Sequence, residues 1–454
     1  MQSESDWMAQ DEAAARSYAY YMRMDPETRE FLGPIETKYD PVFGREVKQR
    51  QAKMGLVRGV KAENMKDYTV FLEPFPHART EHCRELQGWY SSKHDGQKPG
   101  GRERDRPCMT DAVLTQPYTG TCPVQCPFCY VNASSRGYRA TGITMVPMEY
   151  GAFVRKQLQQ MKVAQAGYFT SFHEPFNDLE PIYHNTQAGA TAFVEAGLPI
   201  FFLSRASYPD WAIDLLRKSP FSYAQKSLNT PDEDDWRKLS PRGLPLHQHL
   251  EEIRKLREAG IYVSIQCNPV IGGIVTHDDI ERLFERLAAA GANHVIVKFV
   301  EANHPWVGGM VERMTKAFGA NRAAYFKELF VEKQSGAQTT ILEEYRREGH
   351  TRYRKKATEL GMTYSLCYEY TRREDGRWVS MGPEFLTAEQ CHGHRVPFFR
   401  RSGPRFVPLS VCPPSGCLTC GDSSGVGKCG SGLLGQALAL KQSDFKREPG
   451  FTRV

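Results

Sequence analysis

The stretch AVLTQPYTGTCPVQCPFCY, residues 112–130, joins a strand-like apolar run to a loop that holds three cysteines. Cys122, Cys126 and Cys129 fall close together in this loop, and no fourth cysteine lies nearby. A structural zinc site closes a tetrahedron with four protein ligands, so CxxxCxxC is not a zinc spacing. Three thiolates on a short loop suit a [4Fe–4S] cluster that keeps one iron open for another ligand.

Strand-like and helical runs alternate downstream of this loop, as far as about residue 330. The strand-like runs are AVLTQPY (112–118), AGYFTSF (166–172), PIFFLS (199–204), YAQKSLN (223–229), IYVSIQCNPVI (261–271) and HVIVKFVE (294–301). Six strand–helix units in order predict an α/β fold with a parallel sheet that is closed or partly closed into a barrel. In such barrels the chemistry lies at the carboxyl ends of the strands.

The cysteine loop resembles the CxxxCxφC signature of radical S-adenosylmethionine (radical SAM) enzymes, with Phe128 as the aromatic residue. It directly follows the first strand, where that family places it. The resemblance implies a partial (β/α)6 TIM-like barrel of radical SAM type. It also implies a [4Fe–4S] cluster on the three cysteines, whose open iron chelates S-adenosylmethionine. An electron from a donor such as flavodoxin or ferredoxin would then give a 5′-deoxyadenosyl radical, which abstracts hydrogen from a substrate.

The resemblance also places cofactor contacts at the ends of the following strands. Glu174 is the candidate for holding the amino group of S-adenosylmethionine, with Ser171 and His173 beside it. FTSFHEPF (169–176) departs from the family's Gly-Gly-Glu pattern, so a glutamate that merely precedes a helix is the alternative. Phe128 is expected near the adenine, and NPVIGG (268–273) resembles the glycine region that lets the backbone approach it. Ribose and carboxylate contacts are expected from Ser204, Arg205, Ser227 and Asn229.

The order of motifs is most similar to that of spore photoproduct lyase-like members of the family. The motifs are PYTGTCPVQCPFCYVN (117–132), HEPFNDLEP (173–181) with Glu180, SLNTPDEDDWRKLSP (227–241) and LREAGIYVSIQCNPVIGG (256–273). They cover about residues 111–300, and the cysteine-rich tail has no counterpart that supports the match. We therefore expect a relative with different chemistry and not a repair lyase.

A second group of cysteines lies in the tail, which starts near residue 391 and is rich in Gly, Pro and Ser. Its members are Cys412, Cys417, Cys420 and Cys429, with Cys391 in CHGH as a further candidate ligand. Such a segment has little apolar surface to bury and is expected to fold around a metal. A second [4Fe–4S] cluster is the first interpretation and a structural zinc knuckle the alternative. GDSSGVGKC (421–429) lacks the spacing of a phosphate loop.

Two cysteines on strand-like segments, Cys267 and Cys367, are candidate catalytic residues because a thiol near the radical could donate a hydrogen atom. Inert buried cysteine is the alternative for both. The sequence suggests three regions: an N-terminal extension (1–110), the barrel (111–330) and a helical and cysteine-rich C-terminal region (331–454). Within the extension, KHDGQKPGGRERDR (93–106) is either a solvated linker or a basic nucleic-acid-binding loop.

The composition of the 454 residues is that of an ordinary soluble globular protein, with a net charge of +6. No apolar run reaches the roughly 18 residues of a membrane helix, and the first residues have no signal-peptide core, so we expect a cytoplasmic protein without a membrane partner. The basic balance permits a polyanionic partner. The leading interpretation is modification or rearrangement of a nucleotide base, in DNA or free. Peptide or protein maturation, a small-molecule aminomutase, and a non-enzymatic iron–sulfur or zinc nucleic-acid adaptor are the alternatives.

Overall fold

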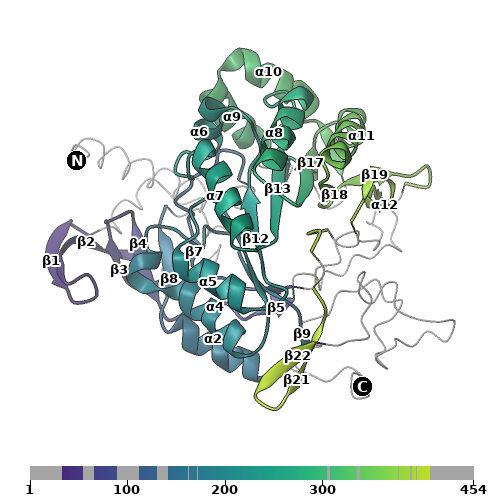
Figure 1. Ribbon diagram of the computed structural model, residues 1–454. Coiled ribbons are helices and arrows are strands. Elements are labelled where there is room, and N and C mark those ends of the chain that lie inside the picture. The colour runs from purple at the N-terminus through teal and green to yellow at the C-terminus, as the bar shows by residue number, and fades with distance from the viewer. Residues whose placement is uncertain are drawn as a thin grey trace.

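The protein is described here by a computed structural model, whose core is a parallel β-sheet covered by helices (Figure 1). The model describes residues 33–54, 66–88, 112–129, 142–161, 163–170, 172–303, 307–334, 338–376, 378–388, 391–394 and 396–408. Among these residues, no helix is long and apolar enough to cross a membrane.

The large sheet confirms all six predicted strands and adds a seventh parallel one. Its order is β18-β14-β13-β12-β11-β10-β6-β5, and only β5, at one edge, runs antiparallel to its neighbour. The strands are β5 (Gln87–Gly88), β6 (Val113–Leu114), β10 (Gly167–Phe169), β11 (Ile200–Ser204), β12 (Tyr223–Ser227), β13 (Val263–Val270), β14 (His294–Phe299) and β18 (Thr363–Leu366). The edge strands β18 and β5 are not paired with each other among the described residues, so the barrel is partial. Because β18 lies beyond residue 330, the sheet extends into the region that the sequence assigned to the C-terminal part.

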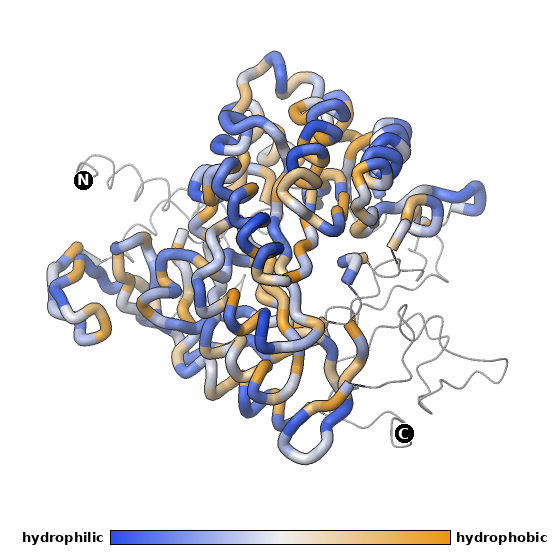
Figure 2. Tube along the Cα trace, in the orientation of Figure 1, coloured by the Kyte–Doolittle hydropathy of each residue, from blue (hydrophilic) through white to orange (hydrophobic). Residues whose placement is uncertain are grey.

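Amphipathic helices connect the strands and cover one face of this sheet. They are α2 (Tyr150–Gln159), α4 (Asn185–Glu195), α5 (Asp210–Lys218), α6 (Glu233–Leu239), α7 (Leu246–Glu258), α8 (His277–Ala289) and α11 (Glu343–Glu359). The start of α8 is fixed by a capping box between Thr276 and Asp279, which satisfies two backbone N–H groups. Figure 2 shows hydrophobic colours along the central strands and hydrophilic colours on the outer surfaces of α7 and α11.

Side chains of the parallel sheet alternate between the helices and the opposite face. Lys226 forms an ion pair with Glu252 of α7, so it points to the helices, and its partner in register is Ile265. The neighbouring Gln225 points the other way, with Ser264 as its partner in register. We call this second face, which carries Gln225, Ser264 and Gln266, the open face.

The amino end of the open face is filled by the chain itself, through residues 391–394. His294 at the start of β14 lies 2.8 Å from the carbonyl oxygen of Cys391, through Nε2. His392 Nδ1 hydrogen-bonds to the hydroxyl of Tyr223 at the start of β12. The ring of His394 lies 4.7 Å from that of Tyr262. The opposite, carboxyl ends of the strands are therefore where a substrate can reach the open face.

A second, mostly antiparallel sheet flanks the cysteine loop, with β7 before the loop and β8 after it. Its order is β1-β2-β3-β4-β8-β7, and it projects to one side of the molecule (Figure 1). The strands are β1 (Glu36–Asp40), β2 (Arg45–Met54), β3 (Lys66–Phe71), β4 (His77–Thr80), β7 (Thr119–Gly120) and β8 (Thr144–Pro147). Gly120 ends β7 at a φ of 78°, and a Cβ there would lie 2.4 Å from the Ile143 carbonyl oxygen. Only glycine fits where the chain enters the loop.

Smaller elements complete the described part of the chain. The short strands are β9 (Val163–Ala164), β15 (Glu301–Asn303), β16 (Glu332–Gln334), β17 (Gln338–Thr340), β19 (Tyr370–Arg372), β20 (Trp378–Ser380), β21 (Phe399–Ser402) and β22 (Arg405–Pro408). The remaining helices are α3 (Glu180–Tyr183), α9 (Val307–Phe318), α10 (Ala320–Leu329) and α12 (Gly382–Phe385). Of these, α9 matters for the site, because it contacts the cysteine loop.

Candidate active site

The cysteine loop lies between β7 and the carboxyl ends of the parallel strands. Its backbone is turned twice, with the N–H of Gln125 donating to Cys122 and that of Cys129 donating to Cys126. Arg313 of α9 donates from Nε to the carbonyl oxygen of Pro127 at 2.8 Å. The three cysteines are half-buried, and none of them is in a disulfide. The sequence could not have pointed to Arg313, which lies 186 residues away in the chain.

The three thiols are arranged in a way that fits an iron–sulfur cluster. Burial raises the pKa of the Cys126 thiol to about 11, and burial also raises that of Cys122, helped by the neighbouring Cys126 and Cys129. The thiols are thus close enough to influence one another. In the described part of the chain, however, no three His, Cys, Asp or Glu side chains converge tightly enough for a single metal ion. A [4Fe–4S] cluster binds each thiolate through a different iron, so three neighbouring thiols on one loop suit it.

Arg205, at the end of β11, lies beside the cysteine loop, as a cofactor-binding role requires. Its guanidinium lies over the rings of Phe128 and Trp236, 5.2 Å from each centroid. It donates at 2.6 Å to the hydroxyl of Ser240, which lies 4.0 Å from the sulfur of Cys126. The structure therefore brings two predicted residues, Arg205 and Phe128, to the cysteines, and adds Ser240, which sits outside the strand series and gave no signal.

Glu174 joins two strand ends through three hydrogen bonds. Its Oε1 accepts from the hydroxyl of Ser204 at 2.6 Å and from the N–H of Phe176 at 3.1 Å, and its Oε2 accepts from the N–H of Arg205 at 2.8 Å. Burial raises its pKa, and these three hydrogen bonds oppose the rise. A carboxylate has about four acceptor positions, so one is left for a further donor such as a cofactor amino group. The predicted contact Ser204 thus donates to Glu174.

His173 connects the same strand end to the cysteine loop. Its Nε2 lies 3.1 Å from the carbonyl oxygen of Thr121, and its Nδ1 lies 3.2 Å from that of Glu174. Both ring nitrogens therefore face the chain's own backbone, which suits a positioning role better than direct cofactor contact. Ser171, predicted beside it, lies outside the described residues.

Asn229 and Ser227 lie at the carboxyl end of β12, where cofactor contacts were predicted. Both are buried, and Ser227 shares the open face with Gln225 by alternation. Asn229 donates from Nδ2 to the carbonyl oxygen of Pro269 at 3.0 Å, while its Oδ1 is buried without a hydrogen-bond partner among the described residues. A buried acceptor left unpaired is costly, so this oxygen fits a ligand N–H or O–H group.

The glycines of NPVIGG, which were expected to let the backbone approach an adenine, pack closely against two helices. A Cβ on Gly273 would lie 2.6 Å from the backbone nitrogen of Phe326 in α10, and one on Gly272 would lie 2.8 Å from Tyr345 of α11. The register of β13 shifts after Cys267, and the chain turns toward the helices. These glycines therefore serve helix packing.

The two candidate hydrogen donors, Cys267 and Cys367, lie on opposite faces of the sheet. Cys267 lies two residues after Ile265 and therefore on the same face of the sheet, toward the helices. It is fully buried, and burial raises the pKa of its thiol to about 12. We therefore assign Cys267 to the apolar core and give it no part in the reaction. Cys367 follows β18 and is half-exposed, with its N–H donating to Val297. Cys367 lies two residues after Ser365, which hydrogen-bonds to His294 on the open face, so Cys367 is expected on the same face. It stays a candidate hydrogen-atom donor.

The predicted ligands of a second metal site are mostly outside the described residues. This applies to Cys412, Cys417, Cys420 and Cys429, and also to the basic loop 93–106. Cys391 is described and buried, at the amino end of the parallel strands, whereas the cysteine loop lies at the carboxyl end. Cys391 therefore cannot share a site with Cys126, and its role as a ligand of the tail site stays a prediction.

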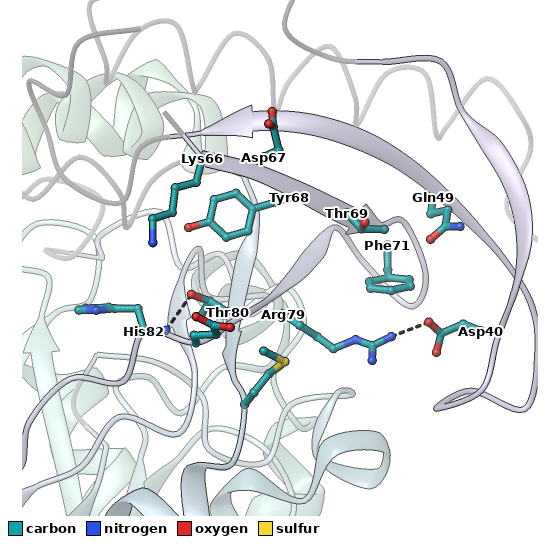
Figure 3. Close-up of a pocket in the computed structure, with 12 residues that line it drawn as sticks. Asp40, Gln49, Lys66, Asp67, Tyr68, Thr69, Phe71, Arg79, Thr80 and His82 are labelled. Atoms are coloured by element: carbon teal, nitrogen blue, oxygen red, sulfur yellow. Dashed lines mark hydrogen bonds and ion pairs between the residues drawn. The ribbon is translucent and has the colours of Figure 1, made fainter. Parts of the chain in front are cut away.

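A cavity of about 510 Å³ lies in the antiparallel sheet (Figure 3). Twelve residues line it, and Figure 3 shows Arg79 reaching across to Asp40 with the ring of Phe71 beside it, while the ring of Tyr68 lies near Lys66. Its cations, Lys66 and Arg79, are offset by nearby carboxylates, so the cavity does not favour a phosphate. The carboxylates are Asp40, Asp67 and Glu81.

Two residues of the open face were missed as site residues, Gln266 and Lys298. Lys298 is buried near the end of β14, between the apolar residues Val297 and Phe299. A lone lysine in a buried strand is a signal that the sequence did carry. Gln266 could be placed only once the register with β12 was known.

Comparisons with known proteins come from three directions. The family model of the radical SAM superfamily matches residues 117–287. A protein of Pseudomonas phage M6, the "Radical SAM Nalpha-GlyT isomerase", is 54% identical over 455 residues, which cover 97% of this chain and 94% of that protein.

Solved structures give weaker similarity. A spore photoproduct lyase variant with bound AdoMet and dinucleoside spore photoproduct is 16% identical, with a TM-score of 0.43, over 58% of this chain and 79% of that one. Streptococcus suis SuiB bound to precursor peptide SuiA is 15% identical, with a TM-score of 0.31, over 40% and 38%.

The site and the comparisons now lead to the same family. The cysteine loop fits a cluster by its geometry, and the phage relative matches from end to end. By its 54% identity to that relative over nearly the whole length, the chain belongs to the radical SAM superfamily of enzymes, whose members bind a [4Fe–4S] cluster and S-adenosylmethionine.

Proposed function

We propose that this enzyme is an isomerase whose substrate is Nα-GlyT, the compound named for its phage relative. The observation that carries the proposal is the 54% identity across 97% of the chain. We read the name as a glycine attached through its α-nitrogen to thymidine. This reading agrees with the interpretation of the sequence, in which the substrate is a modified nucleotide base, and we propose DNA as its carrier.

The proposed roles follow from the positions of the side chains. Cys122, Cys126 and Cys129 would hold the [4Fe–4S] cluster. When bound, the cluster and S-adenosylmethionine supply a 5′-deoxyadenosyl radical that takes a hydrogen atom from the substrate. Arg205 places a cation next to Cys126, where the carboxylate of S-adenosylmethionine would lie, and Phe128, whose ring lies under this guanidinium, is proposed to lie near the adenine.

The other cofactor contacts are proposed at the remaining strand ends. Glu174 keeps one acceptor position for the amino group, while it fixes Ser204 and the backbone of Arg205. Asn229 offers its unpaired Oδ1 to a ribose hydroxyl, with Ser227 beside it on β12. His173 holds the second strand end against the cysteine loop.

Further parts of the proposal concern the second metal site, the electron donor and the return of a hydrogen atom. The tail cysteines would bind a second [4Fe–4S] cluster, with zinc as the alternative, and a flavodoxin or ferredoxin would deliver the electron. The product of an isomerase has the same atoms as its substrate. A hydrogen atom that is abstracted from the substrate must therefore be given back, either the same atom or another one. Cys367, partly buried on the open face, is the candidate for donating it if 5′-deoxyadenosine does not return it directly. The thiyl radical left on Cys367 would then be reduced to the thiol by an electron from the flavodoxin or ferredoxin and a proton from solvent.

The test is a single reaction followed by mass spectrometry. Anaerobically reconstituted protein receives dithionite, S-adenosylmethionine and Nα-GlyT, presented first as the nucleoside and then in an oligonucleotide. We expect a new compound with the mass of the substrate and a different retention time.

A product of different mass would show another radical reaction on the same substrate. If 5′-deoxyadenosine forms but Nα-GlyT stays unchanged in both presentations, the proposed substrate is wrong. A peptide maturase or an aminomutase would then be tested with peptide and amino-acid pools.

A further inference from the structure

A buried lysine lies on the open face near the carboxyl ends of the strands. Lys298 alternates with Phe299, whose ring contacts His350 and Tyr353 of α11 and so faces the helices. The side chain of Lys298 is 9% exposed, and its Nζ lies 3.1 Å from Glu301 and 3.4 Å from the carbonyl oxygen of Tyr368. An ammonium group has three donors, so within the described part of the chain one donor is left over.

A buried acceptor accompanies it on the neighbouring strand. Gln266 of β13 is 8% exposed, and its Oε1 has no hydrogen-bond partner among the described residues. Burying an amide oxygen without a partner costs free energy, so such atoms in native proteins point to a bound ligand or water. Together, the two side chains offer a cation and an acceptor on the same face.

The register of the strands sets the spacing of this pair. Gln266 of β13 pairs with Ile296 of β14, which is two residues before Lys298. With strands about 4.8 Å apart and about 3.3 Å per residue, the two Cα atoms are about 8 Å apart. The side chains of Gln266 and Lys298 extend from these neighbouring Cα atoms to the same face, so a small ligand between them can contact both.

We propose that Lys298 and Gln266 hold the glycine part of the substrate, with Lys298 on its carboxylate and Gln266 on its α-nitrogen N–H. Glu301 and the carbonyl of Tyr368 orient the ammonium and leave its third donor for the carboxylate. The glycine methylene then lies between two fixed points on the open face, beside Cys367 of the adjacent strand end. This inference rests on the proposed function and adds the recognition of an amino-acid carboxylate.

The test compares Nα-GlyT with its glycinamide analogue, in which the carboxylate is a neutral carboxamide. Wild-type enzyme should bind and convert the carboxylate form better, by about 10- to 100-fold in Kd and KM, because a charge-assisted hydrogen bond is lost in the amide. Lys298→Met should abolish this preference, and Lys298→Arg should restore part of it. Gln266→Leu should weaken both compounds alike, since both keep the N–H group.

The controls separate this inference from the proposed function. Lys218→Met removes an exposed lysine of α5 and should leave the preference at the wild-type value. The Kd of S-adenosylmethionine is measured for every variant by equilibrium binding. If Lys298→Met keeps the wild-type preference, or weakens S-adenosylmethionine as much as Nα-GlyT, the inference is wrong while the isomerase proposal stands. If wild-type enzyme converts neither compound, the proposed function fails first.

Discussion

At the scale of single residues, the site is built from side chains that position one another. Arg205 lies over Phe128 and donates to Ser240, and Ser240 reaches toward the sulfur of Cys126. Glu174 accepts from the backbone of Arg205 and so fixes where this cation lies. The side chains around the thiols would therefore already be in place for a cluster.

The cysteine loop gives the first prediction. Cys126→Ala should remove the [4Fe–4S] cluster and abolish formation of 5′-deoxyadenosine, because two thiolates cannot hold a cluster that leaves one iron open. Iron content and 5′-deoxyadenosine are measured on the same reconstituted sample. Cys83→Ala is the matched control, since Cys83 is half-buried near Met148 in another part of the fold. Cleavage of S-adenosylmethionine by Cys126→Ala would refute the assignment.

Glu174 gives the second prediction. In the wild type, both carboxylate oxygens of Glu174 accept hydrogen bonds from N–H or O–H groups. In Glu174→Gln an amide NH2 replaces one of these oxygens, so a donor faces a donor. We expect a loss of about 1–3 kcal/mol in the free energy of unfolding and weaker binding of S-adenosylmethionine. Urea unfolding and equilibrium binding check the two effects. If neither the free energy of unfolding nor the affinity for S-adenosylmethionine changed, the proposed role of the Glu174 carboxylate would be wrong.

At the scale of elements, alternation along each strand decides which residues can take part in chemistry. The sequence predicted six strands, and all six are present, because apolar runs and helix patterns are local signals. It could not tell Cys267 from Cys367, since their faces depend on the register with neighbouring strands. It also could not show how Gly272 and Gly273 pack, because a register shift in β13 turns them toward the helices.

His77 gives an element-scale prediction, since it joins β4 to α3. Its Nδ1 lies 2.8 Å from the Phe75 carbonyl oxygen and its Nε2 lies 3.0 Å from the Tyr183 hydroxyl. Burial lowers the pKa of His77 from an ordinary 6.5 to about 4, although the hydrogen bond to the Phe75 carbonyl acts in the opposite direction and raises it. The folded state thus keeps His77 neutral where the unfolded state binds a proton. The stability that the protein keeps by holding His77 neutral is therefore complete above pH 6.5 and is lost as the pH falls toward 4.

Between pH 7.5 and 5.5, His77 should therefore cost about 1 to 2 kcal/mol of stability. Urea unfolding of wild type and His77→Gln at both pH values isolates this part, because the other buried histidines are common to both proteins. His77→Gln should lose less stability on acidification than wild type. Equal losses would show that His77 is not held neutral.

At the scale of the whole molecule, two sheets meet at the cysteine loop. Strand β7 of the antiparallel sheet ends where the loop begins, and the loop lies against the carboxyl ends of the parallel strands. Residues 391–394 cover the amino end of the open face, whereas the cysteine loop lies at its carboxyl end. The sequence could place the loop, but not this closure, which joins segments 169 residues apart.

The tail gives a prediction for the intact protein. Two four-iron clusters would give about eight irons per chain, whereas one cluster and a zinc knuckle would give about four irons and one zinc. Metal and sulfide counting on the reconstituted full-length protein decides between them. Cys420→Ala should lower the iron count without abolishing formation of 5′-deoxyadenosine. Four irons and no zinc in wild type would exclude both interpretations of the tail.

The most direct test of the account follows hydrogen from substrate to cofactor. Nα-GlyT deuterated at its carbon-bound hydrogens is incubated with the reconstituted enzyme, dithionite and unlabelled S-adenosylmethionine. If the chain is a radical SAM isomerase of this compound, deuterium should appear in 5′-deoxyadenosine, together with an isomer of the substrate. An isomer formed with 5′-deoxyadenosine that carries no deuterium would contradict the account.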